Sequence, residues 1–152
     1  MTENKLCNPQ KSSFGMDGNK AVMIFWLVAS AFMIYPFSAP LAFICPLIFF
    51  LKEKESVFVR FHALQCLIYS IVFGILNIPI GVLSILPLAV DKSTQTADVR
   101  YCPIIKVDFL PYLLGLVFIL LAVLVIVKAN SYEAYKLPIA GPIAEKKYFK
   151  ED

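Results

Sequence analysis

The sequence predicts an all-α integral membrane protein, a small bundle of three to four membrane helices with segments broken by proline and glycine. Of its 152 residues, 59% are hydrophobic, and the mean hydropathy of +0.74 is too high for a water-soluble core of this size. Three stretches lack Asp, Glu, Lys and Arg and reach the roughly 20 residues that a hydrocarbon core requires: 21–51, 61–90 and 109–127.

The chain divides into a mobile polar N-terminal tail (1–20), a helical membrane domain (21–147) and a polar C-terminal tail (148–152). The net charge of +3 is dispersed, without the dense basic patch that nucleic acid requires. The predicted partner is therefore the lipid bilayer, with anionic headgroups near Lys146, Lys147 and Lys150.

The first apolar stretch predicts a helix over 21–35, interrupted by Pro36 and Pro40, which remove backbone donors. A second short helix follows over 41–51. The two pieces fit either one long kinked span or a tight hairpin, and the sequence leaves both open.

A charged turn at 52–55 comes next, and Ser56 is a suitable N-cap for a helix that runs to about Leu76. Three residues that disfavour a continuous helix follow: Asn77, Pro79 and Gly81. They predict a break, with 82–90 as a half-helix packed against protein. The break is either the end of a helix or a hinge that lines a transport path.

The last span begins with Pro111 in its first turn and carries a small residue every seventh position: Gly115, Ala122 and Ala129. Ser70 and Gly74 offer a similar face on the preceding helix. Small residues allow helices to approach closely in lipid, so these are the predicted packing positions. Lysines flank the 52–60 turn and the end of this span, which predicts both on the cytoplasmic side and the neutral 91–108 loop outside.

One helix face concentrates polar side chains inside an apolar segment. His62, Gln65 and Tyr69 fall within about 60° of one another on a helical projection, whereas Arg60 lies nearly opposite. We expect the first three to turn inward toward hydrogen-bond partners and Arg60 to extend to the headgroups or to bind a phosphate or carboxylate.

The residues after the last span are too apolar for a free tail. Pro138, Gly141 and Pro142 oppose a long helix there. We expect this segment, including Lys136, to fold back near Arg60 as a structural latch or a docking peptide for a partner.

Two segments resemble the Tic-twenty-like family, namely 58–65 (FVRFHALQ) and 135–146 (YKLPIAGPIAEK), the latter preceded by Lys128-Ala129-Asn130. The resemblance spans about 21–147. It implies a helical membrane domain, usually of four helices, and for the plastid members a role in moving preproteins through a membrane. For prokaryotic members it implies no settled function.

The sequence contains no catalytic or metal-binding motif, so no cofactor is predicted. His62 and Cys66 are spaced as two ligands but lack further candidates, and four unpaired cysteines do not indicate a disulfide framework. The sequence predicts a non-catalytic subunit or scaffold of a membrane complex, with protein translocation or insertion suggested by the resemblance. The alternative is a transporter or channel component acting as an oligomer. The partner is another membrane protein or a second copy, in a bacterial or archaeal cytoplasmic membrane rather than the plastid inner envelope.

Overall fold

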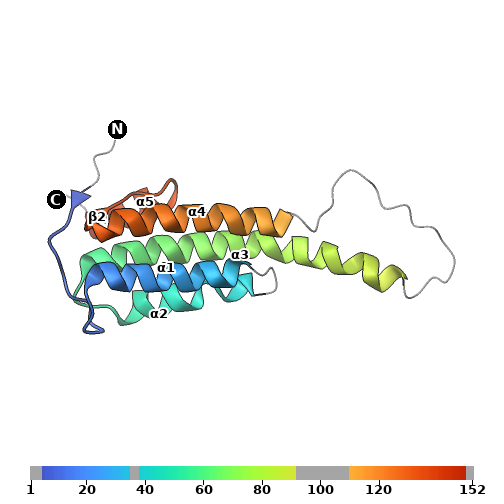
Figure 1. The fold of residues 1–152 in the computed structure, drawn as a ribbon, viewed down its shortest axis with the longest axis horizontal. Coiled ribbons are helices and arrows are strands. Elements are labelled where there is room, and N and C mark those ends of the chain that lie inside the picture. The colour runs from blue at the N-terminus through green and yellow to red at the C-terminus, as the bar shows by residue number, and fades with distance from the viewer. Residues whose placement is uncertain (1–4, 35–37, 92–109, 150–152) are drawn as a thin grey trace.

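The computed structural model describes residues 5–34, 38–91 and 110–149. These form a helical bundle with a two-stranded antiparallel sheet at one end (Figure 1). The all-helical class predicted from the sequence is confirmed. The elements are β1 (Lys5–Leu6), α1 (Gly18–Ile34), the 3-10 helix η1 (Ala39–Leu41), α2 (Ile44–Lys52), α3 (Val57–Asp91), α4 (Leu110–Asn130), β2 (Glu133–Ala134) and α5 (Ala140–Tyr148).

The first apolar stretch is a hairpin rather than one kinked span. In Figure 1, α1 runs away from the end of the bundle that holds β1, and α2 returns to that end. The Ser38 hydroxyl donates to the Phe32 carbonyl at 2.7 Å, which satisfies one of the carbonyls left open in the last turn of α1. Pro40 lies in η1, where a missing amide costs little.

α3 is continuous through the predicted break. It has 35 residues, or about 52 Å at 1.5 Å per residue. The break at Asn77, Pro79 and Gly81, and with it the separate half-helix over 82–90, is therefore wrong. Pro79 removes one helical donor, and Asn77 Nδ2 donates to the Phe73 carbonyl at 2.8 Å one turn earlier. Helices in apolar surroundings keep their remaining hydrogen bonds because no water replaces them.

α4 packs on α1 through small residues, as the sequence predicts. Gly115 and Ala122 are both buried, and a Cβ at position 115 would lie 2.7 Å from the Met33 carbonyl oxygen. The rings of Trp26 and Phe118 fill the next layer, with centroids 5.7 Å apart. The glycine therefore sets the distance between the two helices.

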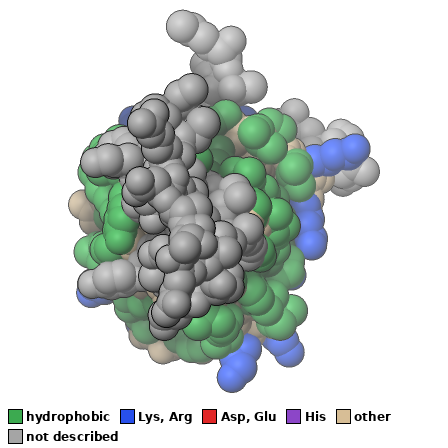
Figure 2. All heavy atoms as spheres, turned by 90° about the vertical axis from the view of Figure 1, so that its right-hand side faces the viewer, with side chains coloured by type: hydrophobic (Ala, Val, Ile, Leu, Met, Phe, Trp, Pro, Cys, Tyr) green, Lys and Arg blue, Asp and Glu red, His purple; other side chains and the backbone are tan. Residues whose placement is uncertain are grey.

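Two of the described helical segments are long and apolar enough to cross a bilayer, Val57–Pro79 of α3 and the whole of α4. α1 and the η1–α2 segment are apolar but shorter. Seen along the bundle from the end opposite β1, the described side chains are mainly hydrophobic, with Lys and Arg only at the outer edge (Figure 2). The predicted outer loop was 91–108; Asp91 is the last residue of α3, and 92–108 lie outside the described residues.

We expect Gly115→Val to destabilise the bundle by about 1–3 kcal/mol, the usual effect of overpacking, because the added side chain meets the Met33 carbonyl. Denaturant unfolding in detergent measures it. Val123→Leu is the matched control, since Val123 lies on the same helix with 53% of its surface exposed. Equal stability of both variants would contradict the close contact.

Candidate functional site

The positive charges of the described residues gather at one end of the bundle, which we call the polar end. It comprises the segment before α1, the turn between α2 and α3, the described residues after α4, and the helix turns that adjoin these segments (Figure 1). Ten of the fourteen Lys and Arg residues of the chain lie there: Lys5, Lys11, Lys20, Lys52, Lys54, Arg60, Lys128, Lys136, Lys146 and Lys147.

A buried carboxylate, Glu53, lies in the turn of the polar end with 1% of its surface exposed. It accepts hydrogen bonds from the hydroxyl of Ser12 and from both the hydroxyl (2.7 Å) and the amide (3.0 Å) of Ser13. The amides of Glu55 and Ser56 add two more at 3.0 Å. A buried carboxylate is tolerated when it is hydrogen-bonded in this way.

These donors decide the charge of Glu53. Burial by itself raises the pKa of this carboxyl group, but the hydrogen bonds from Ser12, Ser56 and Ser13 outweigh it and lower the pKa to about 2. Each of these bonds favours the ionised form. Glu53 is therefore a fixed anion at neutral pH, and it holds together two segments about forty residues apart in the chain.

The segment before α1 was predicted to be a mobile tail over 1–20. In the structure its described residues follow a defined path, because the turn and β2 supply partners for their polar groups. β1 pairs with β2, and the Cys7 amide donates to the Tyr132 carbonyl at 2.9 Å. Ser56 caps α3 as predicted, accepting from the Val59 amide at 3.2 Å, and its hydroxyl also donates to Gln10 Oε1 at 3.0 Å. α1 begins at Gly18, inside the predicted tail.

The polar stripe of α3 faces the chain that follows β2. Gln65 Nε2 donates to the Tyr135 carbonyl, and the Leu137 amide donates to Gln65 Oε1, both at 3.2 Å. The Tyr69 hydroxyl donates to the Pro138 carbonyl. The predicted inward orientation of these two side chains and the return of the chain onto α3 are confirmed. Their role toward a partner protein stays a prediction.

His62 is fully buried between two aromatic rings, with centroids 4.7 Å from Phe58 and 5.2 Å from Phe61. Neither ring nitrogen makes a hydrogen bond of standard geometry within the described chain, although the main chain of Glu133 faces the ring. Cys66, one turn on, lies near Ser70 Oγ at 4.0 Å. The described residues contain no group of three His, Cys, Asp or Glu side chains placed to hold a metal ion.

The segment predicted as a latch closes with α5. Lys136 Nζ contacts Glu145 Oε1 at 2.5 Å, and a Cβ at Gly141 would lie 2.9 Å from the Lys136 backbone. Glycine at position 141 therefore allows the start of α5 to lie this close to the backbone of Lys136. Arg60 does not reach freely into solvent, because its guanidinium carbon lies 5.2 Å from the centre of the Tyr148 ring.

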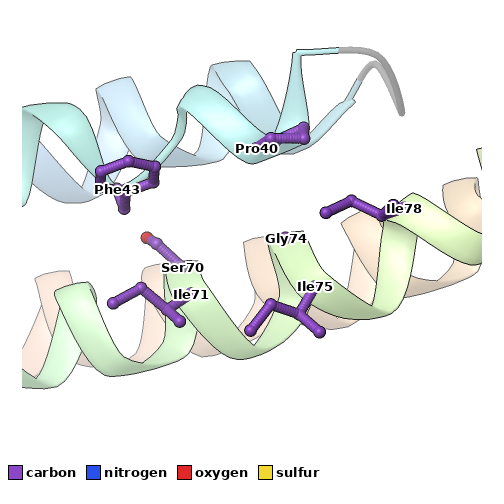
Figure 3. Close-up of a pocket in the computed structure, with 7 residues that line it drawn as sticks. All are labelled: Pro40, Phe43, Ser70, Ile71, Gly74, Ile75 and Ile78. Atoms are coloured by element: carbon purple, nitrogen blue, oxygen red, sulfur yellow. The ribbon is translucent and has the colours of Figure 1, made fainter.

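Ser70 and Gly74 form a packing face, on η1 and the start of α2. A Cβ at Gly74 would lie 3.5 Å from the Ala39 carbonyl oxygen, an ordinary contact. Figure 3 shows Ser70 and Gly74 on α3 beneath Phe43 and Pro40, lining an apolar pocket of about 140 Å³ together with Ile71, Ile75 and Ile78.

Sequence reasoning missed the cluster around Glu53. From the sequence, Ser12 and Ser13 were assigned to the mobile tail, and Glu53 was assigned to the charged turn. No spacing rule connects residues about forty positions apart, and the available signal was only an acidic residue three positions before the N-cap Ser56.

An all-helical bundle that leaves long apolar helix faces exposed and collects its charges at one end is the arrangement of a helical membrane protein. Comparison with known proteins gives the family. The model of the MamF_MmsF family, described as the magnetosome magnetite crystal formation protein family, matches residues 17–144, and the chain belongs to this family.

Two archaeal relatives carry the name UPF0132 membrane protein. The one from Archaeoglobus fulgidus is 35% identical over 100 residues, which cover 66% of this chain and 78% of that protein. The one from Methanocaldococcus jannaschii is 29% identical over 111 residues, which cover 73% of this chain and 64% of that protein. No solved structure matches the chain.

The resemblance to the Tic-twenty-like family is therefore wrong, and the preprotein role that it implied loses its support. The family match covers the first of the two segments on which the resemblance was based and all but the last two residues of the second. Those segments are 58–65 and 135–146, and in the structure they pack against each other through Gln65.

The stability of the protein should fall in acid through Glu53. Its pKa is about 2 in the folded state against an ordinary 4.5, so the unfolded chain takes up the proton first as pH falls. The stabilisation is complete above about pH 4.5 and is lost between there and pH 2; it amounts to on the order of 3 kcal/mol. Unfolding in detergent, followed across this pH range, measures it.

Glu53→Gln should abolish most of that pH dependence and lower the stability at pH 7. Glu55→Gln is the matched control, because Glu55 is an exposed acid in the same turn. A wild-type protein whose stability does not change between pH 5 and about 2.5 would contradict the proposed role of the carboxylate.

Gln65→Leu should release the chain after β2. The change leaves the half-buried Tyr135 carbonyl and the buried Leu137 amide without their partner, a loss of about 1–3 kcal/mol. Hydrogen exchange at the Leu137 amide should become faster, whereas Ile75→Leu, at a position 60% exposed on the same helix, should leave it unchanged. Unaltered protection of Leu137 in the Gln65 variant would show that this bond does not hold the segment.

Proposed function

We propose that the protein is a multi-pass membrane protein that acts as a non-catalytic subunit or scaffold and associates through the outer face of α4. The observation that carries the proposal is a second helix-packing seam on α4. The inner seam repeats at alternating steps of three and four residues and is buried: Gly115, Phe118, Ala122, Val125 and Ala129. The outer seam repeats in the same way and is 39–63% exposed: Leu113, Leu116, Leu120, Val123 and Val127.

Steps of three and four residues are the spacing by which one helix packs along another. The two seams lie two residues apart, about 200° around the helix. α1 occupies the inner seam, and the outer one is free to take a helix of a second copy. Leu120, Val123 and Val127 line a shallow hollow of about 280 Å³ beside Lys128, into which side chains of a facing helix can fit.

The exposure of α4 supports a place in the bilayer. Of the residues in its most apolar stretch, 28% are buried in the bundle, against 56% in α3. A soluble protein does not leave a helix this apolar open to water. In this arrangement α3 and α4 cross the membrane. α1 and the segment formed by η1 and α2 are embedded beside them, which gives four embedded segments. The concentration of Lys and Arg at the polar end supports a cytoplasmic location for that end and both termini.

Two other roles have less support. The transporter or channel alternative relied on a break at Asn77–Gly81, where the structure has a continuous helix. The description of the family names magnetite crystal formation. We do not extend it to this chain, because Asp17, Glu133 and Glu145 are each paired with a lysine, and the described residues contain no group of three His, Cys, Asp or Glu side chains placed to hold a metal ion.

Cysteine cross-linking in native membranes tests the proposal. In a background without the natural cysteines, Leu120→Cys and Val123→Cys should each give a cross-linked product of twice the monomer mass upon oxidation. Met23→Cys, 40% exposed on α1 and away from the outer seam, is the matched control and should stay monomeric.

A cross-linked product of a different mass at Leu120 would show that the partner is another membrane protein rather than a second copy. The proposed role as a subunit would then stand. Monomer alone at both α4 positions would overturn association through this seam. Labelling of Lys54→Cys and Ser131→Cys with an impermeant reagent should occur from the cytoplasmic face only, and labelling from outside would overturn the proposed orientation.

A further inference from the structure

We propose that Arg60, Lys147 and Tyr148 form a binding site for the phosphate headgroup of an anionic phospholipid, where α5 lies on the beginning of α3. The inference rests on the membrane location proposed above, but it concerns a different surface from the outer seam of α4. Its site is built by residues from two elements that are far apart in the sequence.

Two cations share one aromatic ring at this place. The Arg60 guanidinium carbon lies 5.2 Å and Lys147 Nζ 5.8 Å from the centre of the Tyr148 ring. Lys147 Nζ is also 4.8 Å from the Phe50 ring of α2. Each contact is an attractive cation–π pair, and the shared ring brings two positive charges to one place on the surface. An anion bound there is attracted by both of them.

Among the described residues, the acidic residue of α5 does not neutralise them. Glu145 of α5 is engaged with Lys136 at 2.5 Å, and the other ion pairs of the described residues use Lys20 and Lys128. Arg60, Lys146 and Lys147 make no ion pair within the described chain. The surface of α5 that meets the headgroup layer is therefore positively charged.

Two hydrogen-bonding groups at the same place have no protein partner among the described residues. Arg60 Nε and the Tyr148 hydroxyl are both buried and unpaired. Leaving such groups unsatisfied is costly, and most of them in folded proteins find a partner. Phosphate oxygens accept from both a guanidinium and a phenol, and Arg binds phosphate with strong charge-assisted bonds.

The apolar residues of α5 favour a lipid over free phosphate. Ile139 is 75% and Ile143 is 52% exposed, and Ile143 lies one turn before Lys147 on the same face. A short helix with exposed isoleucines next to lysines has the pattern of an interfacial segment. The isoleucines contact acyl chains while the cations reach the phosphate.

Native mass spectrometry of the detergent-purified protein tests the site. The protein is equilibrated with equal amounts of phosphatidylglycerol and phosphatidylcholine that carry the same acyl chains. The wild type should retain phosphatidylglycerol several-fold over phosphatidylcholine. This preference should fall toward unity in Lys147→Gln and in the Arg60→Gln, Lys147→Gln double variant, and it should persist in Lys54→Gln, which removes an exposed cation of the same end.

Lys147 is exposed, so its single variant tests the site even if the double variant does not fold. An unchanged preference in Lys147→Gln, or an equal loss in Lys54→Gln, would overturn the proposal. Displacement of the lipid by millimolar inorganic phosphate would overturn the lipid as the ligand and leave an anion site. Because the readout is bound lipid rather than association, this test can fail while the cross-linking at α4 succeeds, and the reverse also holds.

Discussion

The buried carboxylate of Glu53 is the interaction on which the arrangement of the first three helices depends. It lies directly after α2 and shortly before α3, and it draws in Ser12 and Ser13 from the chain that leads into α1. One anion therefore fixes where one helix ends, where the next begins, and how the hairpin closes. A lysine in its place could not accept these hydrogen bonds, because an ammonium group only donates, so the sign of the charge is part of the fold.

The second constraint is the burial of polar side chains on α3. Gln65 bonds to the main chain after β2, and Asn77 bonds to its own helix. The first kind of bond ties the C-terminal segment to the bundle, and the second keeps the helix intact near a proline. Both buried side chains need a hydrogen-bond partner. Gln65 finds it in a tertiary contact, and Asn77 finds it within its own helix.

Much of the fold follows from the sequence because it depends on local pattern. Charge-free stretches, the N-cap at Ser56 and the spacing of Gly115 and Ala122 are read within one helix, and the structure contains all three features. The return of the segment after α4 toward Arg60 was also predictable, since an apolar segment with prolines must be covered, but its hydrogen bonds to Gln65 were not. The continuity of α3 could not be predicted in this way. The rules for proline and glycine come from helices in water, where water can hydrogen-bond to the backbone groups that a break exposes.

The site could be predicted only in part, and the reason lies in how the polar end is assembled. A helical projection places Arg60 on a different face of α3 from His62. It cannot predict the contact of Arg60 with Tyr148, because that contact depends on where α5 ends. Likewise, the sequence does not distinguish Glu53 from its exposed neighbour Glu55. Only in the folded structure do the serines before α1 cover Glu53. Both features arise when segments near the two chain ends meet a central turn. In such a bundle the helices determine which end is polar, and the terminal segments determine which of its charges remain available to a ligand.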